Sequence, residues 1–214
     1  MEVRELLYNY SWCAWLLIHL GLSWFYSPHF SDDSFIFFRY AENWGNGYGP
    51  VWNMGESVEG FSSPLWLYIL SLGHAIGIYV PNLAKLLGLL FGFGAVYLVG
   101  QLAKHIGVYE HRGWLMCGAS LTVGLHYWSP AGLETSLYCF LWCASLLALV
   151  ENKWLWAVAL LGLARPEGLL ILFFWCVGDW LLSQRFRWRN YIWIVLPSVG
   201  WLTFRMYFYE IEDS

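Results

Sequence analysis

The sequence predicts an all-α, polytopic membrane protein in which residues 1–214 form a single module. Three observations support this fold class. Hydrophobic residues make up 59% of the chain and charged residues only 12%, whereas soluble domains carry about 25% charged residues. Aromatic residues reach 21% and include 16 Trp, and Trp and Tyr are enriched where a bilayer meets water. The apolar residues also gather into long runs separated by polar connectors.

Seven apolar runs predict about seven transmembrane helices. They cover approximately residues 6–26, 82–103, 113–128, 136–150, 154–164, 168–183 and 191–207. A transmembrane helix needs roughly 20 apolar residues, each rising 1.5 Å, and several of these runs are shorter. The fifth run would extend only ~16 Å. Either the site to which it leads is recessed in the membrane, or the helix boundaries lie elsewhere.

The first run, Leu6 to Tyr26, predicts a retained transmembrane helix. It is long for the apolar region of a signal peptide, and it lacks a small-residue cleavage site.

The apolar segment Phe61–Val80 is predicted not to cross the membrane. Basic residues are concentrated in the connectors Lys104–Arg112 and Gln184–Asn190 and at Lys153, and basic connectors favour the cytoplasmic side. All three share that side only if Phe61–Val80 lies along or dips into the outer leaflet, as a helix capped by Ser63-Pro64. This topology places the N-terminus in the cytoplasm and the first outer loop at about residues 27–81.

The runs 154–164 and 168–183 have an alternative interpretation as one long helix broken at Arg165-Pro166. That helix would bring Arg165 and Glu167 near the middle of the membrane, where charge is costly unless it lines a cavity. With one continuous helix, the basic connectors would also no longer all lie on the same side of the membrane. We therefore favour two helices joined on the outer side.

Several function classes have no support in the sequence. The net charge is −4 and no basic stripe is present, so no nucleic-acid partner is expected. The five cysteines lie within apolar runs and are interpreted as small buried hydrophobic residues. No Ser-His-Asp arrangement, phosphate-binding loop or HExxH motif appears, so neither a hydrolase nor a nucleotide-binding protein is indicated.

Asp32 and Asp33 are the first candidates for chemistry, since they follow the first predicted helix on the outer side. Adjacent carboxylates at a membrane surface suit three roles. One carboxylate can act as a general base, the pair can hold a divalent metal ion, or they can cap the helix predicted over Ser34–Trp44.

The remaining candidates come from later connectors on the outer side. Glu134 opens the run 136–150, where the helix dipole favours an anion, or it points into a shared cavity. Arg165 and Glu167 join two short helices, so Arg165 either pairs with a carboxylate or binds a phosphate. Arg205 closes the last helix with Glu210. A polar cavity open to the outer leaflet is predicted from five of these residues, which are Asp32, Asp33, Glu134, Arg165 and Glu167. A lipid with a charged head and a carbohydrate would enter it sideways.

These residues resemble the signatures of a known family. Asp32-Asp33-Ser34-Phe35-Ile36, Arg39-Tyr40-Ala41 and Asn43 resemble the first outer loop of GT-C glycosyltransferases, as do Gly47-Tyr48-Gly49, Val58-Glu59-Gly60 and Pro64-Leu65-Trp66. Gly132-Leu133-Glu134-Thr135 and Arg165-Pro166-Glu167-Gly168 resemble two further signatures in the same order. The likeness covers about residues 30–170, and the subfamily it resembles most contains the terminal arabinofuranosyltransferases of bacterial cell envelopes.

The resemblance implies a seven-helix module in a bacterial inner membrane, with the active site facing the periplasm or exterior. It implies transfer of a sugar, with inversion, from a polyprenyl-phosphate donor to a glycan, lipid or protein acceptor, in contact with membrane lipid. Asp32 or Asp33 would be the general base. Arg165, with Arg39 or Arg205, would stabilise the phosphate, and Glu134 and Glu167 would bind substrate. The resemblance assigns no cofactor, and a divalent metal ion stays only one of the three alternatives for Asp32 and Asp33.

The sequence also departs from the family pattern. Ser63 stands where family members usually have Asn, and Tyr209-Glu210-Ile211 stands where they commonly have a Tyr-Gly-Asp-like motif. Two alternatives to an enzyme therefore stay open. One is a non-catalytic or partner-dependent membrane subunit that binds lipid-linked sugar, and the other is a transporter or channel.

Overall fold

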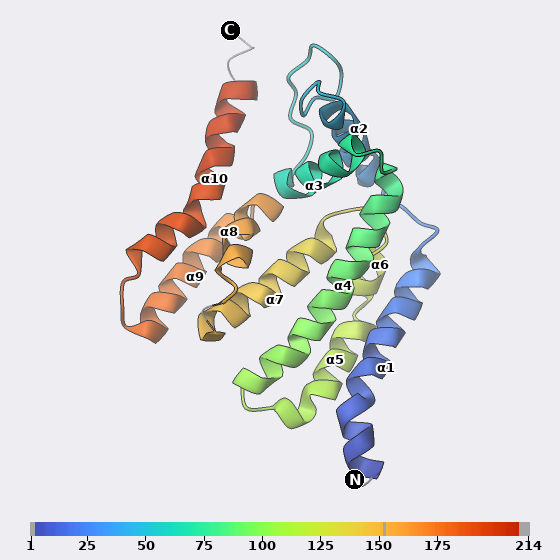
Figure 1. The fold of residues 1–214 in the computed structure, drawn as a ribbon, viewed down its shortest axis with the longest axis vertical. Coiled ribbons are helices and arrows are strands. Elements are labelled where there is room, and N and C mark those ends of the chain that lie inside the picture. The colour runs from blue at the N-terminus through green and yellow to red at the C-terminus, as the bar shows by residue number, and fades with distance from the viewer. Residues whose placement is uncertain (1–2, 152, 210–214) are drawn as a thin grey trace.

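The computed structural model describes residues 3–151 and 153–209, with side chains from Cys13 onward, and this part of the chain contains helices and no strands (Figure 1). The all-α class is therefore confirmed for these residues. The elements are α1 (Val3–Tyr26), α2 (Asp32–Gly45), α3 (Pro64–Ala75), α4 (Val80–His105), the 3₁₀ turn η1 (Tyr109–His111), α5 (Arg112–Leu121), α6 (Val123–Trp128), α7 (Thr135–Glu151), α8 (Leu155–Ala164), α9 (Gly168–Ser183) and α10 (Trp188–Tyr209).

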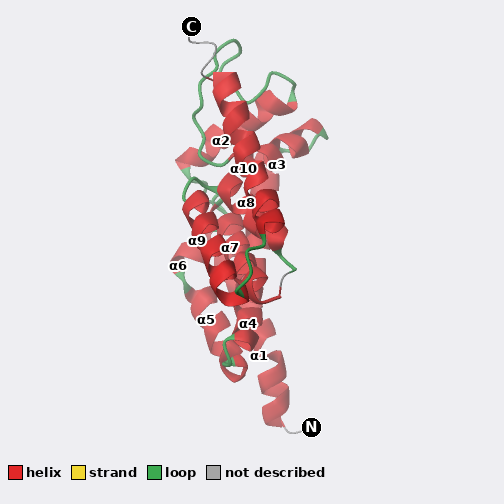
Figure 2. Cartoon of the chain, turned by 90° about the vertical axis from the view of Figure 1, so that its left-hand side faces the viewer, coloured by secondary structure: helices red, strands yellow, loops and turns green. Residues whose placement is uncertain are grey.

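The molecule is elongated, and most helices run along its long axis (Figures 1 and 2). The short helices α2 and α3 lie at the upper end, where α10 also finishes. The connections after α6 and α8 point towards this end, whereas those after α4, α7 and α9 point the other way. The helix directions therefore bring segments from four distant parts of the chain towards one end.

The prediction of about seven transmembrane helices is wrong. Within the residues that the structure describes, only α4 (Val80–His105) is both long and apolar enough to cross a membrane. Side chains of α1 are described only over Cys13–Tyr26, which is a shorter apolar stretch. Helices α5 to α10 fail for physical reasons of two kinds. Helices α5, α6, α7, α8 and α9 have 10, 6, 17, 10 and 16 residues, which is short of the roughly 20 needed. Helix α10 has 22 residues but is rich in Trp and Tyr and contains two arginines.

The run 113–128 contains a helix boundary that the sequence did not predict. Thr122 adopts an extended backbone conformation with ψ of 112° and divides this run into α5 and α6. A β-branched residue loses side-chain freedom in a helix, but the sequence has no Gly or Pro at this point. Between α8 and α9, by contrast, the predicted division is confirmed, because Arg165 is extended (φ −158°, ψ 151°) and ends α8.

Helix α3 begins as the sequence predicts. The Trp66 backbone N–H donates to Ser63 Oγ at 3.3 Å, and Pro64 occupies the first helical position, where its missing N–H costs nothing. The helix has 12 residues and extends ~18 Å, which is too short to cross a bilayer. Helix α2 begins at Asp32, two residues before the predicted start.

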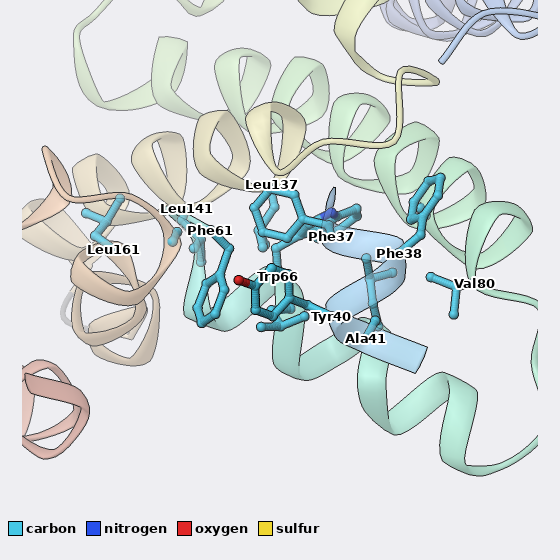
Figure 3. Close-up of a cluster of buried hydrophobic side chains, with 14 of the residues drawn as sticks. Phe37, Phe38, Tyr40, Ala41, Phe61, Trp66, Val80, Leu137, Leu141 and Leu161 are labelled. Atoms are coloured by element: carbon cyan, nitrogen blue, oxygen red, sulfur yellow. The ribbon is translucent and has the colours of Figure 1, made fainter. Parts of the chain in front are cut away.

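A buried aromatic cluster attaches α2 and α3 to the rest of the molecule (Figure 3). Phe37 and Tyr40 of α2 and Trp66 of α3 pack with Leu137 of α7 and Leu161 of α8. Trp66 and Leu161 are fully buried. Each large apolar side chain removed from water contributes about 1.5–3 kcal/mol. The cluster therefore fixes α2 and α3 above α7 and α8.

Candidate functional site

A cavity of about 530 Å³ opens where α2, the loop before α3, the start of α7 and the end of α8 meet. Its polar wall consists of three carboxylates and one guanidinium from four separate segments. Asp33, Glu59, Glu134 and Arg165 provide these groups, and the other lining residues are Ile36, Phe37, Gly60, Phe61, Ser62 and Leu133. The cavity shares Phe37 and Phe61 with the buried cluster drawn in Figure 3.

Helix α2 distinguishes the two adjacent aspartates. Ser31 occupies the N-cap position, although its side chain makes no capping hydrogen bond, and Asp32 and Asp33 lie in the first turn. Carboxylates in this turn interact favourably with the helix dipole. Successive residues of a helix project about 100° apart, and of the two only Asp33 lines the cavity. Asp32 is exposed beside it.

The loop before α7 is fixed by α2 and α3. Trp66 Nε1 donates to the Gly132 carbonyl at 3.0 Å, and the Ser31 N–H donates to the Ala131 carbonyl at 3.0 Å. Gly132 has φ of +90°, and a Cβ at this position would lie 2.9 Å from Cβ of Ser34. The close approach therefore requires glycine, and it sets the position of Glu134 two residues later.

Glu134 is a buried carboxylate with one unsatisfied oxygen. Its residue exposure is 3%, and Oε1 accepts a hydrogen bond from Arg165 Nη1 at 3.3 Å. Oε2 is buried with no hydrogen-bond partner among the described residues. Burial raises the pKa of Glu134, and the nearby carboxylates of Glu167 and Asp33 raise it further, against the lowering effects of its own backbone N–H and of Arg165.

Arg165 joins this buried carboxylate to an exposed one. Its Nε and Nη2 donate to the two oxygens of Glu167 at 3.3 and 3.4 Å, and its guanidinium lies 5.9 Å from the ring centre of Tyr138. The Glu167 side chain is 61% exposed. Its own backbone N–H, followed by the hydrogen bond from Arg165, lowers its pKa. An exposed pair of this kind is worth only about 0–1 kcal/mol, so an incoming anion can replace Glu167.

The loop between α2 and α3 forms the remaining wall. The buried Tyr40 hydroxyl donates to the Val58 carbonyl at 2.6 Å and accepts from the Gly60 N–H at 2.9 Å. Glu59, between them, forms an ion pair with Arg205 of α10. The loop is therefore held from below by α2 and from the side by α10.

The structure brings together some of the predicted site residues and separates others. Asp33, Glu134 and Arg165 line one cavity, and Glu167 lies at its rim through Arg165. Arg205 reaches the cavity only through Glu59. Arg39 is exposed and donates to the Trp52 carbonyl at 3.3 Å; like Asp32, it does not line the cavity. Glu210, predicted beside Arg205, lies outside the described residues.

Sequence reasoning missed Glu59 as a site residue. It lies in a long connector with no periodic pattern, and only the folding of residues 46–63 brings it to the cavity. In the sequence, Glu59 stood out only as part of the Val58-Glu59-Gly60 run that contributes to the family resemblance. Among the described residues, no group of three or more His, Cys, Asp or Glu side chains is arranged to hold a metal ion.

The cavity combines an exposed carboxylate, a buried carboxylate with one oxygen that no described residue bonds, and a guanidinium whose ion pair with Glu167 is exposed. Such a set can accept a proton from a hydroxyl, orient a second hydroxyl and hold an anionic group. Comparison with models of protein families, with curated proteins and with solved structures finds no match to this chain. Evidence about function therefore comes from the cavity itself.

Proposed function

We propose that this protein is a membrane glycosyltransferase that moves a sugar from a polyprenyl-phosphate donor to a hydroxyl of a glycan, lipid or protein acceptor. The observation that carries the proposal is the shared cavity of Asp33, Glu134 and Arg165. The three groups match the needs of such a transfer, which are a base for the acceptor, an acceptor of sugar hydroxyls and a cation for the leaving phosphate.

In the proposed reaction, Asp33 takes the proton from the acceptor hydroxyl as its oxygen attacks the anomeric carbon. The bond between this carbon and the phosphate oxygen breaks, and the electron pair leaves with the polyprenyl phosphate. Attack opposite to the leaving group inverts the anomeric centre. Arg165 exchanges Glu167 for the phosphate, whose charge grows as the bond breaks. Glu134 accepts a sugar hydroxyl on Oε2, the oxygen without a partner among the described residues.

A neighbouring apolar groove supports a lipid-linked donor. The groove has a volume of about 320 Å³ and is lined mainly by apolar side chains of α3, α8 and α10, including Leu65, Leu163 and Trp201. Phe61, a wall residue of the polar cavity, lies against Trp201 with ring centres 5.9 Å apart. The polyprenyl chain would occupy this groove while its phosphate lies in the polar cavity.

The test is release of polyprenyl phosphate from a panel of polyprenyl-phosphate sugars by purified protein in liposomes. Asp33→Asn should abolish release and retain donor binding, because it removes the base but keeps the shape of the cavity. Asp32→Asn is the matched control, one residue away and outside the cavity, and it should keep most activity. Donor binding without release by the wild type would instead indicate a non-catalytic or partner-dependent subunit.

A further inference from the structure

A second feature lies at the other end of α10, far from the cavity. Helix α9 ends at Ser183, its C-cap residue Gln184 has φ of 53°, and the chain then passes through Arg185, Phe186 and Arg187 into α10. Figure 1 shows this connection at the outer edge of the molecule, remote from α2 and α3. We call residues 185–189, in which arginines alternate with Phe186 and Trp188, the basic aromatic turn.

The basic aromatic turn leads directly into an apolar groove on α10. The groove has a volume of about 400 Å³ and almost no polar wall. It is lined by Phe186 and Trp188 from the turn and by Ile192, Val195, Leu196 and Val199 from the helix. Phe186 is 70% exposed. An exposed groove lined by apolar side chains can hold a hydrocarbon chain, because the chain buries apolar surface there.

The turn that supplies Phe186 and Trp188 to the groove carries three arginines. Arg187 lies 3.7 Å from the buried carboxylate of Asp179, which also accepts a hydrogen bond from the Tyr191 hydroxyl at 2.9 Å. This pairing fixes the turn to α9. Arg185 and Arg189 are exposed, and neither forms an ion pair with a described residue. Two exposed cationic residues therefore lie next in sequence to Phe186 and Trp188, which line the groove.

We propose that the basic aromatic turn and this groove bind an anionic phospholipid. The phosphate lies between Arg185 and Arg189, and one acyl chain lies along the groove from Phe186 to Val199. Charge complementarity favours this occupant, because arginines near a membrane attract anionic headgroups. The aromatic residues favour it also, since Trp and Tyr prefer the headgroup level of a bilayer. The site requires no donor sugar and no active cavity, so it is independent of the proposed transfer reaction.

The experiment is native mass spectrometry of the detergent-solubilised full chain, offered phosphatidylglycerol and phosphatidylcholine at equal concentrations. The wild type should retain phosphatidylglycerol preferentially. An arginine near anionic lipid changes binding by about fivefold, so Arg185→Gln with Arg189→Gln should remove most of the preference. The matched control is Lys104→Gln with Lys153→Gln, which removes the same charge from the last turn of α4 and from the connection between α7 and α8 and should leave the preference intact.

Val199→Trp tests the groove without changing charge. It should fill the groove and reduce retention of both lipids. Equal retention of the two lipids by the wild type would overturn the proposal, as would an equal loss of preference in the lysine control. Light scattering on the same samples provides a further check. A wild-type dimer that Val199→Trp converts to a monomer would assign the groove to a second copy of the chain and overturn the lipid site.

Discussion

Glu134 and Arg165 are 31 residues apart in the chain, yet Nη1 of Arg165 lies 3.3 Å from Oε1 of Glu134 at the wall of the cavity. The pairing satisfies only half of the carboxylate, because Oε2 is buried without a partner among the described residues. A buried polar atom without a hydrogen bond costs about 1–3 kcal/mol. A ligand hydroxyl that donates to this oxygen would therefore add a favourable hydrogen bond to the site.

The first prediction concerns the energetic coupling of these two residues. Arg165→Gln leaves the buried carboxylate of Glu134 without its cation and should destabilise the protein. Glu134→Gln should cost less, because a neutral amide is easier to bury. The double variant should be more stable than the sum of the single effects indicates, by about 0.5–3 kcal/mol. Denaturant unfolding of the four proteins in detergent measures this coupling, and additive effects would show that the contact carries no energy.

The second prediction is a pH dependence with a definite sign. The pKa of Glu134 is raised in the folded state above its ordinary value of 4.5, chiefly by burial. The folded protein therefore holds this proton to higher pH than the unfolded chain. The stabilisation is complete below pH 4.5 and is lost as the pH rises through the raised pKa. Relative to Glu134→Gln, the wild type should thus become progressively less stable as the pH increases from 4.5.

Glu167→Gln provides the opposite control for that measurement. The pKa of Glu167 is lowered below 4.5, first by its own backbone N–H and then by Arg165. Its stabilisation is present above pH 4.5 and disappears as the pH falls through the lowered pKa. Thermal unfolding midpoints from pH 3 to pH 8, with each variant compared with wild type, should therefore slope in opposite directions. Parallel slopes would contradict the assignment of the two environments.

Tyr40 gives the third prediction, which concerns the loop wall of the cavity. Tyr40→Phe keeps the buried ring but removes the hydroxyl that bonds both the Val58 carbonyl and the Gly60 N–H. Loss of this hydroxyl, which is a hydrogen-bond partner of two backbone groups, should lower the free energy of unfolding by about 1–3 kcal/mol. Hydrogen exchange should accelerate over residues 58–60 and transfer activity should fall, because Glu59 is then held only by its ion pair with Arg205. Tyr48→Phe, at an exposed position of the same loop, should change neither measurement.

Local signals in the sequence were sufficient for part of this architecture. The Ser63-Pro64 start of α3 and the break at Arg165 depend on capping and on proline, which act over a few residues. The break at Arg165, together with the alternation of basic connectors, was enough to predict that Glu134 and Arg165 lie at the same end of the molecule. The sequence could not predict which of Asp32 and Asp33 lines the cavity. That depends on where α2 starts, and therefore on how the helix is rotated.

The number of membrane-spanning helices was wrong because apolar composition does not determine helix length. Residues 113–128 are continuously compatible with one helix, but the extended conformation of Thr122 divides them. Glu59 was missed for a different reason. It reaches the cavity through a loop held by Tyr40 and Arg205, and such long-range contacts leave no periodic pattern in the sequence.

The fourth prediction separates two roles of glycine near the site. Gly132 and Gly55 have similar φ values, +90° and +84°, and alanine in this region costs roughly 1–2 kcal/mol at either position. Their surroundings differ. A Cβ at Gly55 meets nothing within 4 Å, whereas at Gly132 it lies 2.9 Å from Ser34, 3.0 Å from Phe30 and 3.1 Å from Phe38.

Gly132→Ala should therefore destabilise the protein by about 1–3 kcal/mol more than Gly55→Ala, since overpacking adds to the backbone strain. It should also lower turnover, because relief of the contacts moves α2 and Asp33 away from the loop that carries Glu134. Donor binding should change less than turnover if Arg165 keeps its position. The test is to measure the free energy of unfolding and the turnover of both variants. If both variants lose the same free energy of unfolding, only backbone strain operates at Gly132, and its contact with α2 does not position the site.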